Sequence, residues 1–167
     1  MSLESFAKWL ADTPMSQVVQ NVSWIIPSVQ SFHILCIAIV ISAVFMVDLR
    51  LLGVIGRNQP TAAYTSRFLS WIWPMLVLLL LSGSILIIGE PSRSLLNPAF
   101  QTKMVLLILA MITTFALQRP TLKDPAYWEL TAGHRMSARA LAVISMLLWV
   151  GIIFAGRWIA YMNTAGE

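Results

Sequence analysis

The sequence predicts an all-α integral membrane protein: a four-helix bundle preceded by a short N-terminal amphipathic helix at the membrane interface. Hydrophobic residues occupy 58% of the 167 positions and charged residues only 11%, whereas soluble domains carry about 25% charged residues. Four apolar runs are also close to or above the roughly 20 residues that a helix needs to cross a bilayer. This composition excludes an ordinary soluble domain and predicts the lipid bilayer as the main partner of the chain.

The N-terminal segment, residues 1–24, is too polar to cross the hydrocarbon. Leu3, Phe6 and Leu10 follow helical spacing, and Ser2 is placed to cap the first turn. One apolar face beside a polar one is typical of a helix that lies in the plane of the membrane surface. We therefore predict an interfacial helix here, separate from the membrane domain that follows.

The membrane domain, residues 25–167, is predicted to contain four spans joined by loops. The first loop includes "GRNQP", the second "EPSRSLLNP" and the third "QRPTLKDP", and the Gly and Pro residues of these segments interrupt helices. Pro74, inside the second span, is expected to kink it. The predicted spans cover residues 25–47, 68–89, 100–117 and 138–162.

The distribution of Lys and Arg predicts the orientation of these spans, because cationic residues in short loops stay on the cytoplasmic side. The first and third loops carry most of them: Arg50, Arg57, Arg67, Arg119, Lys123, Arg135 and Arg139. The opposite side carries fewer: Lys8, Arg93 and Arg157, with Lys103 just inside a helix. Loops one and three are therefore expected in the cytoplasm and both termini outside. The cations lie at helix ends, so no nucleic-acid partner is expected.

Charges at the cytoplasmic boundary are interpreted chiefly as topology determinants. Asp48 ends the first apolar run and is followed by Arg50. The carboxylate is placed to pair with Arg139 or Arg67, which lie at the same predicted depth. An ion pair there would leave no unbalanced charge at the end of the span.

The outer half of the membrane contains the candidate functional groups. His33 lies about eight residues inside the first span, roughly 12 Å deep at 1.5 Å per residue, and Lys103 lies about 5 Å deep in the third. Glu90 and Arg157 lie near the same face. Ionisable residues within a span are costly and usually face the bundle interior or water, so they are candidates for function.

Four further residues help to define this site. Gly83 is expected at nearly the depth of His33, where bare backbone lets either a flat ligand or a neighbouring helix approach. Ala110 and Thr114 share the helix face of Lys103, which predicts that this face points inward. His134 precedes the fourth span at the inner boundary, on the order of 15 Å or more from His33 in depth, so the two histidines are not expected to share one iron.

Several short motifs resemble a known family. The histidine of "SFHILCIA", a cationic residue after that span and the third-span opening "FQTKMVLLILA" resemble the bacterial membrane-embedded protoporphyrinogen IX oxidases and the related copper-resistance CopD-like membrane domains. The segments "VDLRLLG" and "AGRWIAY" are closer still to an uncharacterised bacterial four-span family. The resemblance covers the first and third spans by motif and the others by hydropathy. It implies a bacterial inner-membrane protein with b-type haem and a functional pair, His33 and Lys103.

The leading interpretation is a protein that binds haem b and takes part in membrane redox or tetrapyrrole chemistry. His33 is the expected metal ligand through a neutral imidazole. Lys103 and Arg157 are expected to neutralise the propionates, and Gly83 to admit the macrocycle. If the protein is an oxidase, Lys103 and His33 are the catalytic candidates, as acceptors of substrate protons.

Two other interpretations remain open. A copper-handling protein would use the soft ligands of the chain, namely His33, Cys36, Met75, Met104, Met111 and Met146. A non-catalytic structural or assembly subunit would use His33 as a helix-to-helix hydrogen bond and let Lys103 reach the outer headgroups. That interpretation adds other membrane subunits or a second copy of the chain as partners.

Overall fold

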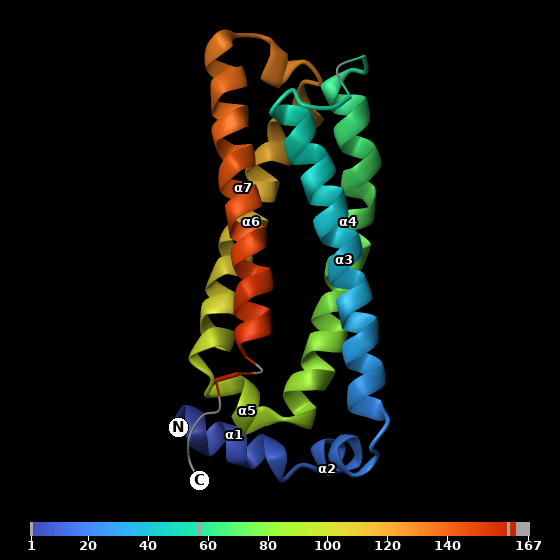
Figure 1. Cartoon of the computed structure of the whole chain (residues 1–167), viewed down its shortest axis with the longest axis vertical. Helices are drawn as coiled ribbons and strands as arrows, with labels where there is room; N and C mark the ends of the chain where they lie inside the picture. Colours follow the sequence, from blue (N-terminus) through green and yellow to red (C-terminus); the bar gives the residue numbers. More distant parts are fainter. Residues whose placement is uncertain (1, 57, 160, 163–167) are drawn as a thin grey trace.

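A computed structural model describes residues 2–56, 58–159 and 161–162, and every regular element in these ranges is helical (Figure 1). Four of these helices are long and apolar enough to cross a membrane. The predicted all-α membrane bundle is therefore confirmed. In chain order the elements are α1 (Leu3–Ala11), α2 (Pro14–Asn21), α3 (Ile25–Leu51), α4 (Thr61–Gly89), α5 (Pro91–Leu95), α6 (Pro98–Lys123), the 3₁₀ turn η1 (Tyr127–Glu129) and α7 (Ala132–Trp158).

The long helices extend beyond most of the span ends expected from hydropathy. Hydropathy marks the apolar length, whereas backbone hydrogen bonds continue into the polar flanks until a cap or a breaker stops them. At the start of α7 the Thr131 side chain accepts a hydrogen bond from the His134 amide at 3.1 Å. At the other end α7 stops at Trp158, short of the predicted residue 162.

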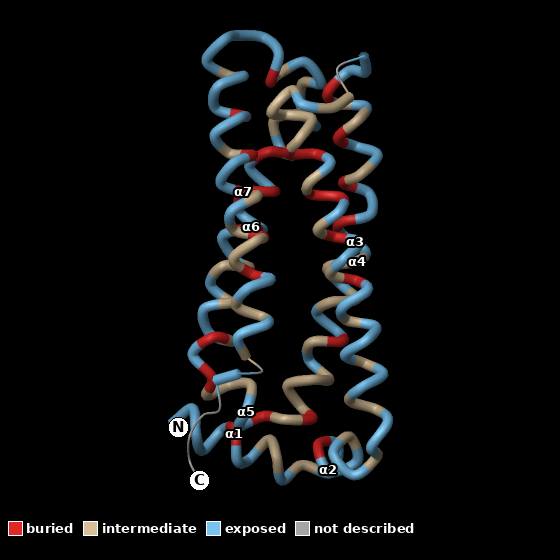
Figure 2. The backbone as a smooth tube through the Cα atoms, in the orientation of Figure 1, coloured by how far each residue is buried: buried red, intermediate tan, exposed pale blue. Residues whose placement is uncertain are grey.

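The four spans form two helical hairpins, α3 with α4 and α6 with α7, and α3 also packs on α7 (Figure 1). Close approach within the second hairpin depends on a small residue: a Cβ added to Gly151 would lie 3.3 Å from Leu106 Cδ1. Figure 2 shows the buried positions of the long helices on the sides that face the interior. The main core comprises Val40, Ala43, Val44, Leu69, Ile72, Ala110, Trp149 and Ile152.

The outward faces of the spans are apolar. Leu80 is 71% exposed and Leu147 is 67% exposed, and Ile108 is exposed as well. Large apolar side chains exposed along all the long helices are unfavourable in water but match the hydrocarbon of a bilayer. The chain is therefore a multi-pass membrane protein that contacts lipid.

The N-terminal segment lies across one end of the bundle, where α1 packs on α5 and α2 packs on α4 (Figure 1). It forms two helices where one was expected, because Thr13 caps the Ser16 amide at 3.4 Å and Pro14 occupies the first turn of α2. Ser16 in turn donates to the Ile88 carbonyl at 2.6 Å. This buried contact fixes the interfacial segment to the end of α4.

Candidate functional site

The candidate site is built around His33, which is half-buried in the third turn of α3. Its Nδ1 lies 2.7 Å from Ser82 Oγ on α4, and Ser82 Oγ lies 2.6 Å from the Leu78 carbonyl oxygen. The single hydroxyl proton goes to the carbonyl, which cannot donate, so Ser82 accepts from Nδ1–H. The network therefore assigns the Nδ1–H tautomer, in which Nε2 keeps its lone pair.

Gly83 lies beside the same imidazole. A Cβ added at Gly83 would be 3.4 Å from His33 Cε1, which is van der Waals contact. The prediction that Gly83 shares the depth of His33 is thus confirmed. Two consecutive residues of α4 act on the ring in different ways: Ser82 orients it, and Gly83 leaves the space at its edge free of a side chain.

Lys103 approaches from the other hairpin. It is half-buried on α6, and its Nζ lies 3.9 Å from the position of a Cβ added to Gly156 on α7. Its charge lies within electrostatic range of His33. Ala110 and Thr114 on the same helix are buried, so the prediction that this face points inward is confirmed. Lys103 therefore lies against α7 within its own hairpin, as His33 lies against α4 in the other.

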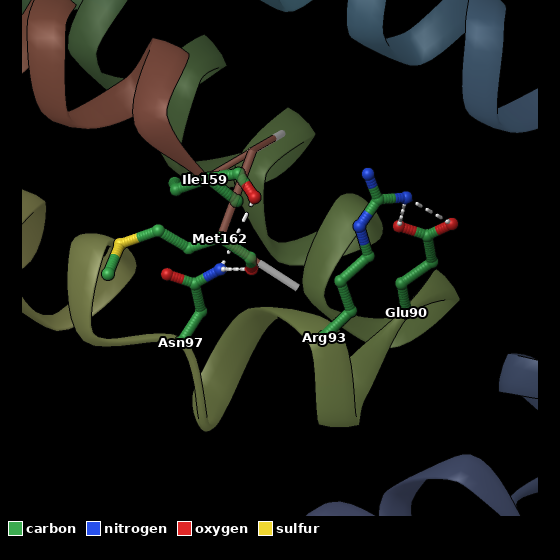
Figure 3. Close-up of polar contacts among 5 residues, drawn as sticks. All are labelled: Glu90, Arg93, Asn97, Ile159 and Met162. Carbon is green, nitrogen blue, oxygen red and sulfur yellow. Dashed lines mark hydrogen bonds and ion pairs between the residues drawn. The ribbon is translucent and has the colours of Figure 1, made fainter. Parts of the chain in front are cut away.

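The other charges predicted for the outer half have partners of their own. Arg157 is exposed, donates from Nη2 to the Tyr161 hydroxyl at 2.6 Å and lies over that ring at 4.9 Å. Glu90 forms an ion pair with Arg93 at 3.0 Å (Figure 3). Of the four ionisable groups predicted for the outer half, Arg157 and Glu90 thus have local partners, whereas Lys103 acts on His33 through its charge.

Sequence reasoning missed Asn97, which positions the helix that carries Lys103. Asn97 is fully buried and donates from Nδ2 to the Met162 carbonyl at 3.0 Å and to the Ile159 carbonyl at 3.3 Å (Figure 3). Its Oδ1 accepts from the Ala99 amide at 2.9 Å. One amide side chain thus caps α6 and ties its start to the end of α7. The Asn-Pro pair at a helix start is a cap signal in the sequence.

The expected ion pair of Asp48 is wrong. Asp48 is only 1% exposed, and neither carboxylate oxygen has a hydrogen-bond partner among the described residues. Its pairing with Arg139 or Arg67 fails because Asp48 lies on the buried face of α3 with Val44 and Val47, pointing into the bundle. The neighbouring Arg57 lies outside the described residues.

The cationic end of the bundle is organised by Glu129, which sequence reasoning also missed. Its carboxylate accepts from the Thr61 hydroxyl and lies 3.7 Å from Arg50, and its carbonyl accepts from Arg135 at 3.0 Å. A cavity of about 250 Å³ lies here, lined in part by Arg50, Arg135 and Arg139. The sequence did contain a signal for this group of arginines. Arg135 and Arg139 are spaced i, i+4, which places them on one helix face.

His134 lies at this same cationic end, far from His33 along the bundle axis (Figure 1). Its Nδ1 is 3.1 Å from the Tyr127 carbonyl, and its ring stacks on Tyr127 with 4.3 Å between centroids. Cys36 is buried one turn after His33. Within the described ranges, no three His, Cys, Asp or Glu side chains gather as a metal site.

Comparison with known proteins identifies one family. A model described as a family of unknown function (DUF6644) matches residues 10–162. The matched range includes all four spans, and with them His33 and Lys103. No curated protein and no solved structure matches the chain.

Proposed function

The chain belongs to the family DUF6644, and from its outer-half site we propose that it is a bacterial inner-membrane protein that binds haem b through His33 and takes part in membrane redox or tetrapyrrole chemistry. One observation carries this proposal. Ser82 accepts the Nδ1–H hydrogen bond of His33, which leaves Nε2 unprotonated with a lone pair available for iron. A neutral imidazole with its second nitrogen hydrogen-bonded is the usual state of a metal-ligating histidine. A porphyrin supplies four nitrogens, so a single imidazole suffices to hold its iron.

The surroundings of His33 fit a flat anionic ligand. Gly83 keeps a side chain away from the ring edge, and Lys103 brings a positive charge from the facing hairpin. The Lys103 ammonium is placed to hold a propionate, and Arg157 could bind the second only by leaving Tyr161. Haem b, when bound, supplies one-electron chemistry.

The catalytic part of the proposal concerns Lys103 and His33, and it follows the resemblance to the protoporphyrinogen oxidases. Lys103 takes part in neither ion pair of the described residues, Arg50 with Glu129 or Arg93 with Glu90. A lysine without a carboxylate partner in an apolar site is suited to lose its own proton and then accept one from a bound substrate. In this step Lys103 acts as the neutral amine and not as the ammonium that holds a propionate. Substrate oxidation would therefore require Lys103, while His33 holds the cofactor.

The proposed topology places this site in the outer half of the membrane. Loops one and three, which contain most of the arginines and lysines, are assigned to the cytoplasm, and both termini to the outer side. His33 lies about two turns from the outer start of α3, and Lys103 is in the second turn of α6. Propionates bound there would lie near the outer headgroups, where charge is better solvated.

The test is an absorption spectrum of the detergent-purified protein, oxidised and dithionite-reduced, for three forms. The wild type and His134→Ala should both show a haem Soret band, because His134 is remote from the site. His33→Ala should lose the band while eluting from size exclusion like the wild type. A colourless wild type from haem-replete cells, or a band unchanged in His33→Ala, would overturn the proposal.

The hydrogen bond from His33 to Ser82 also favours one alternative, a non-catalytic structural or assembly subunit. In that role His33 would join α3 to α4 and nothing more. The two functions differ in their signatures: the structural role predicts a colourless protein whose stability falls equally in His33→Ala and Ser82→Ala. It also predicts co-purification with other membrane chains.

A further inference from the structure

The cavity of about 250 Å³ at the cationic end of the bundle is lined by arginines from two helices. Arg50 comes from the last turn of α3, and Arg135 and Arg139 come from the first two turns of α7. Arg139 reaches toward the end of α3, because its Nη2 lies 4.0 Å from the position of a Cβ added to Gly53, which lines the same cavity. The cavity therefore lies where the two hairpins adjoin, and each hairpin contributes arginine to it.

The described residues that line this cavity carry a surplus of positive charge. They include three arginines and one glutamate, Glu129, so two positive charges are in excess. The Glu129 carboxylate already accepts from the Thr61 hydroxyl and lies 3.7 Å from Arg50. Neither Arg135 nor Arg139 takes part in an ion pair within the described part of the chain. The surplus therefore belongs to the two arginines of α7.

Arg135 and Arg139 are both exposed, so an anion can reach them from outside the bundle. Like charges spaced i, i+4 repel on a helix, and an anion bound between them would replace that repulsion with attraction. A guanidinium offers several N–H donors in a planar fork. Within the described ranges Arg135 donates only from Nη2, to the Glu129 carbonyl at 3.0 Å. Donors therefore remain for a ligand with several acceptor oxygens.

We infer that Arg50, Arg135 and Arg139 form a binding site for the phosphate group of a phosphate monoester. Planar guanidinium forks match phosphate oxygens in pairs. A phosphate monoester carries about −1.5 to −2 charges at pH 7, which balances the surplus of the cavity, whereas a single carboxylate would leave part of it. Leu51 and Trp128 line the same cavity and offer apolar surface to the carbon part of the ester.

The size of the cavity is consistent with this ligand. Its volume of about 250 Å³ is several times the roughly 30 Å³ that one water occupies in the liquid, so a phosphate group and adjoining atoms fit. Two sources share this chemistry, a soluble phosphate monoester and the membrane lipid phosphatidic acid. The site is independent of the haem proposal, because it lies at the opposite end of the bundle from His33 and shares no residue with the haem site (Figure 1).

The experiment measures the binding of two phosphate monoesters to the full-length protein in detergent at constant ionic strength. Glycerol phosphate, titrated calorimetrically, represents the soluble source. Radiolabelled phosphatidic acid in phosphatidylcholine micelles represents the lipid source. The wild type should bind at least one of them saturably, and the tighter of the two identifies the source. If it binds neither, the inference is overturned.

Substitutions at Arg139 separate a defined site from general surface charge. Arg139→Gln should weaken binding by about tenfold or more, which is the usual effect of losing a charged hydrogen-bond donor. Arg139→Lys keeps the charge but lacks the planar fork, so it should weaken binding by a smaller factor. Arg119→Gln is the matched control and should bind like the wild type. Arg119 is exposed near the same end of the bundle, lies over the Phe115 ring at 5.0 Å and does not line the cavity.

Elution from size exclusion and the melting temperature without ligand establish that each variant is folded. Arg139→Lys retains the positive charge, so it provides a folded comparison even if Arg139→Gln is unstable. Wild-type affinity in either folded Arg139 variant would overturn the inference. Equal losses in Arg139→Gln and Arg119→Gln would also overturn it, because the anion would then be attracted by the charge of this membrane end as a whole.

Discussion

Ser82 Oγ lies 2.7 Å from Nδ1 of His33 while donating to the carbonyl of its own helix at 2.6 Å. A hydroxyl in a helix commonly bonds to the carbonyl one turn back. Here that local bond uses the only hydroxyl proton, so the oxygen can only accept a hydrogen bond from His33. The tautomer of the candidate iron ligand is thus set by a residue that would not contact the iron. The first prediction follows from this relationship.

Ser82→Ala should weaken haem binding by about 10- to 100-fold without removing the ligand, which is the usual cost of losing the partner that orients a metal-bound imidazole. Haem titration of the purified protein measures this directly. Ser84→Ala is the matched control, because Ser84 is exposed and makes only a helix-internal bond to the Leu80 carbonyl. Equal affinities of the two variants would show that Ser82 does not orient His33.

Substitutions at Gly83 test whether haem binding needs the space beside His33. Gly83→Ala should retain haem, because a Cβ there makes ordinary contact with His33 at 3.4 Å. Gly83→Leu should lose it, since the longer side chain occupies the edge of the imidazole. Haem content per protein, measured on folded fractions from size exclusion, decides the question. If Gly83→Leu binds haem like the wild type, the macrocycle does not pass Gly83.

Lys103→Met should keep the Soret band but weaken haem affinity, and it should abolish any tetrapyrrole oxidation. The methionine side chain has a similar length but lacks the amino group, which holds a propionate when protonated and accepts a proton when neutral. Lys123→Met, at the opposite end of α6 and exposed, is the control. Activity that survives in Lys103→Met together with normal haem affinity would assign Lys103 a purely interfacial role.

Asn97→Ala should destabilise the protein by about 1–3 kcal/mol, because it leaves the buried Ala99 amide and the carbonyls of Ile159 and Met162 without this partner at the junction of α6 and α7. The readout is thermal unfolding in detergent. Gln101→Ala provides the comparison, since Gln101 is exposed and donates only to the Leu95 carbonyl. Should the two variants melt at the same temperature, the contacts of Asn97 with the end of α7 do not stabilise the fold.

The assigned orientation can be tested with single cysteines introduced in a Cys36→Ser background. A cysteine at Ser92, which is exposed next to the outer end of α4, should react with a membrane-impermeant maleimide applied to spheroplasts. A cysteine at Ser137, exposed near the start of α7, should react only after lysis. The reverse labelling pattern would invert the topology and place His33 in the cytoplasmic half.

The positions along the membrane normal could be predicted from the sequence because the rise per residue of a helix is constant. That rule placed Gly83 at nearly the depth of His33 and separated His33 from His134 in depth. The four spans were predictable for a related reason, since the bilayer requires a minimum apolar length and satisfied backbone groups. The helix ends were less predictable, because local caps such as Thr131 extend helices into polar sequence.

Lateral relationships were decided only by the tertiary structure. The sequence placed Asp48 at one end of the first span, yet it favoured an arginine partner for Asp48. The fold instead turns Asp48 inward, onto the buried face of α3 with Val44 and Val47. Depth follows from counting residues along one helix, whereas the rotation of each helix and the choice of its neighbours depend on packing between segments distant in the sequence.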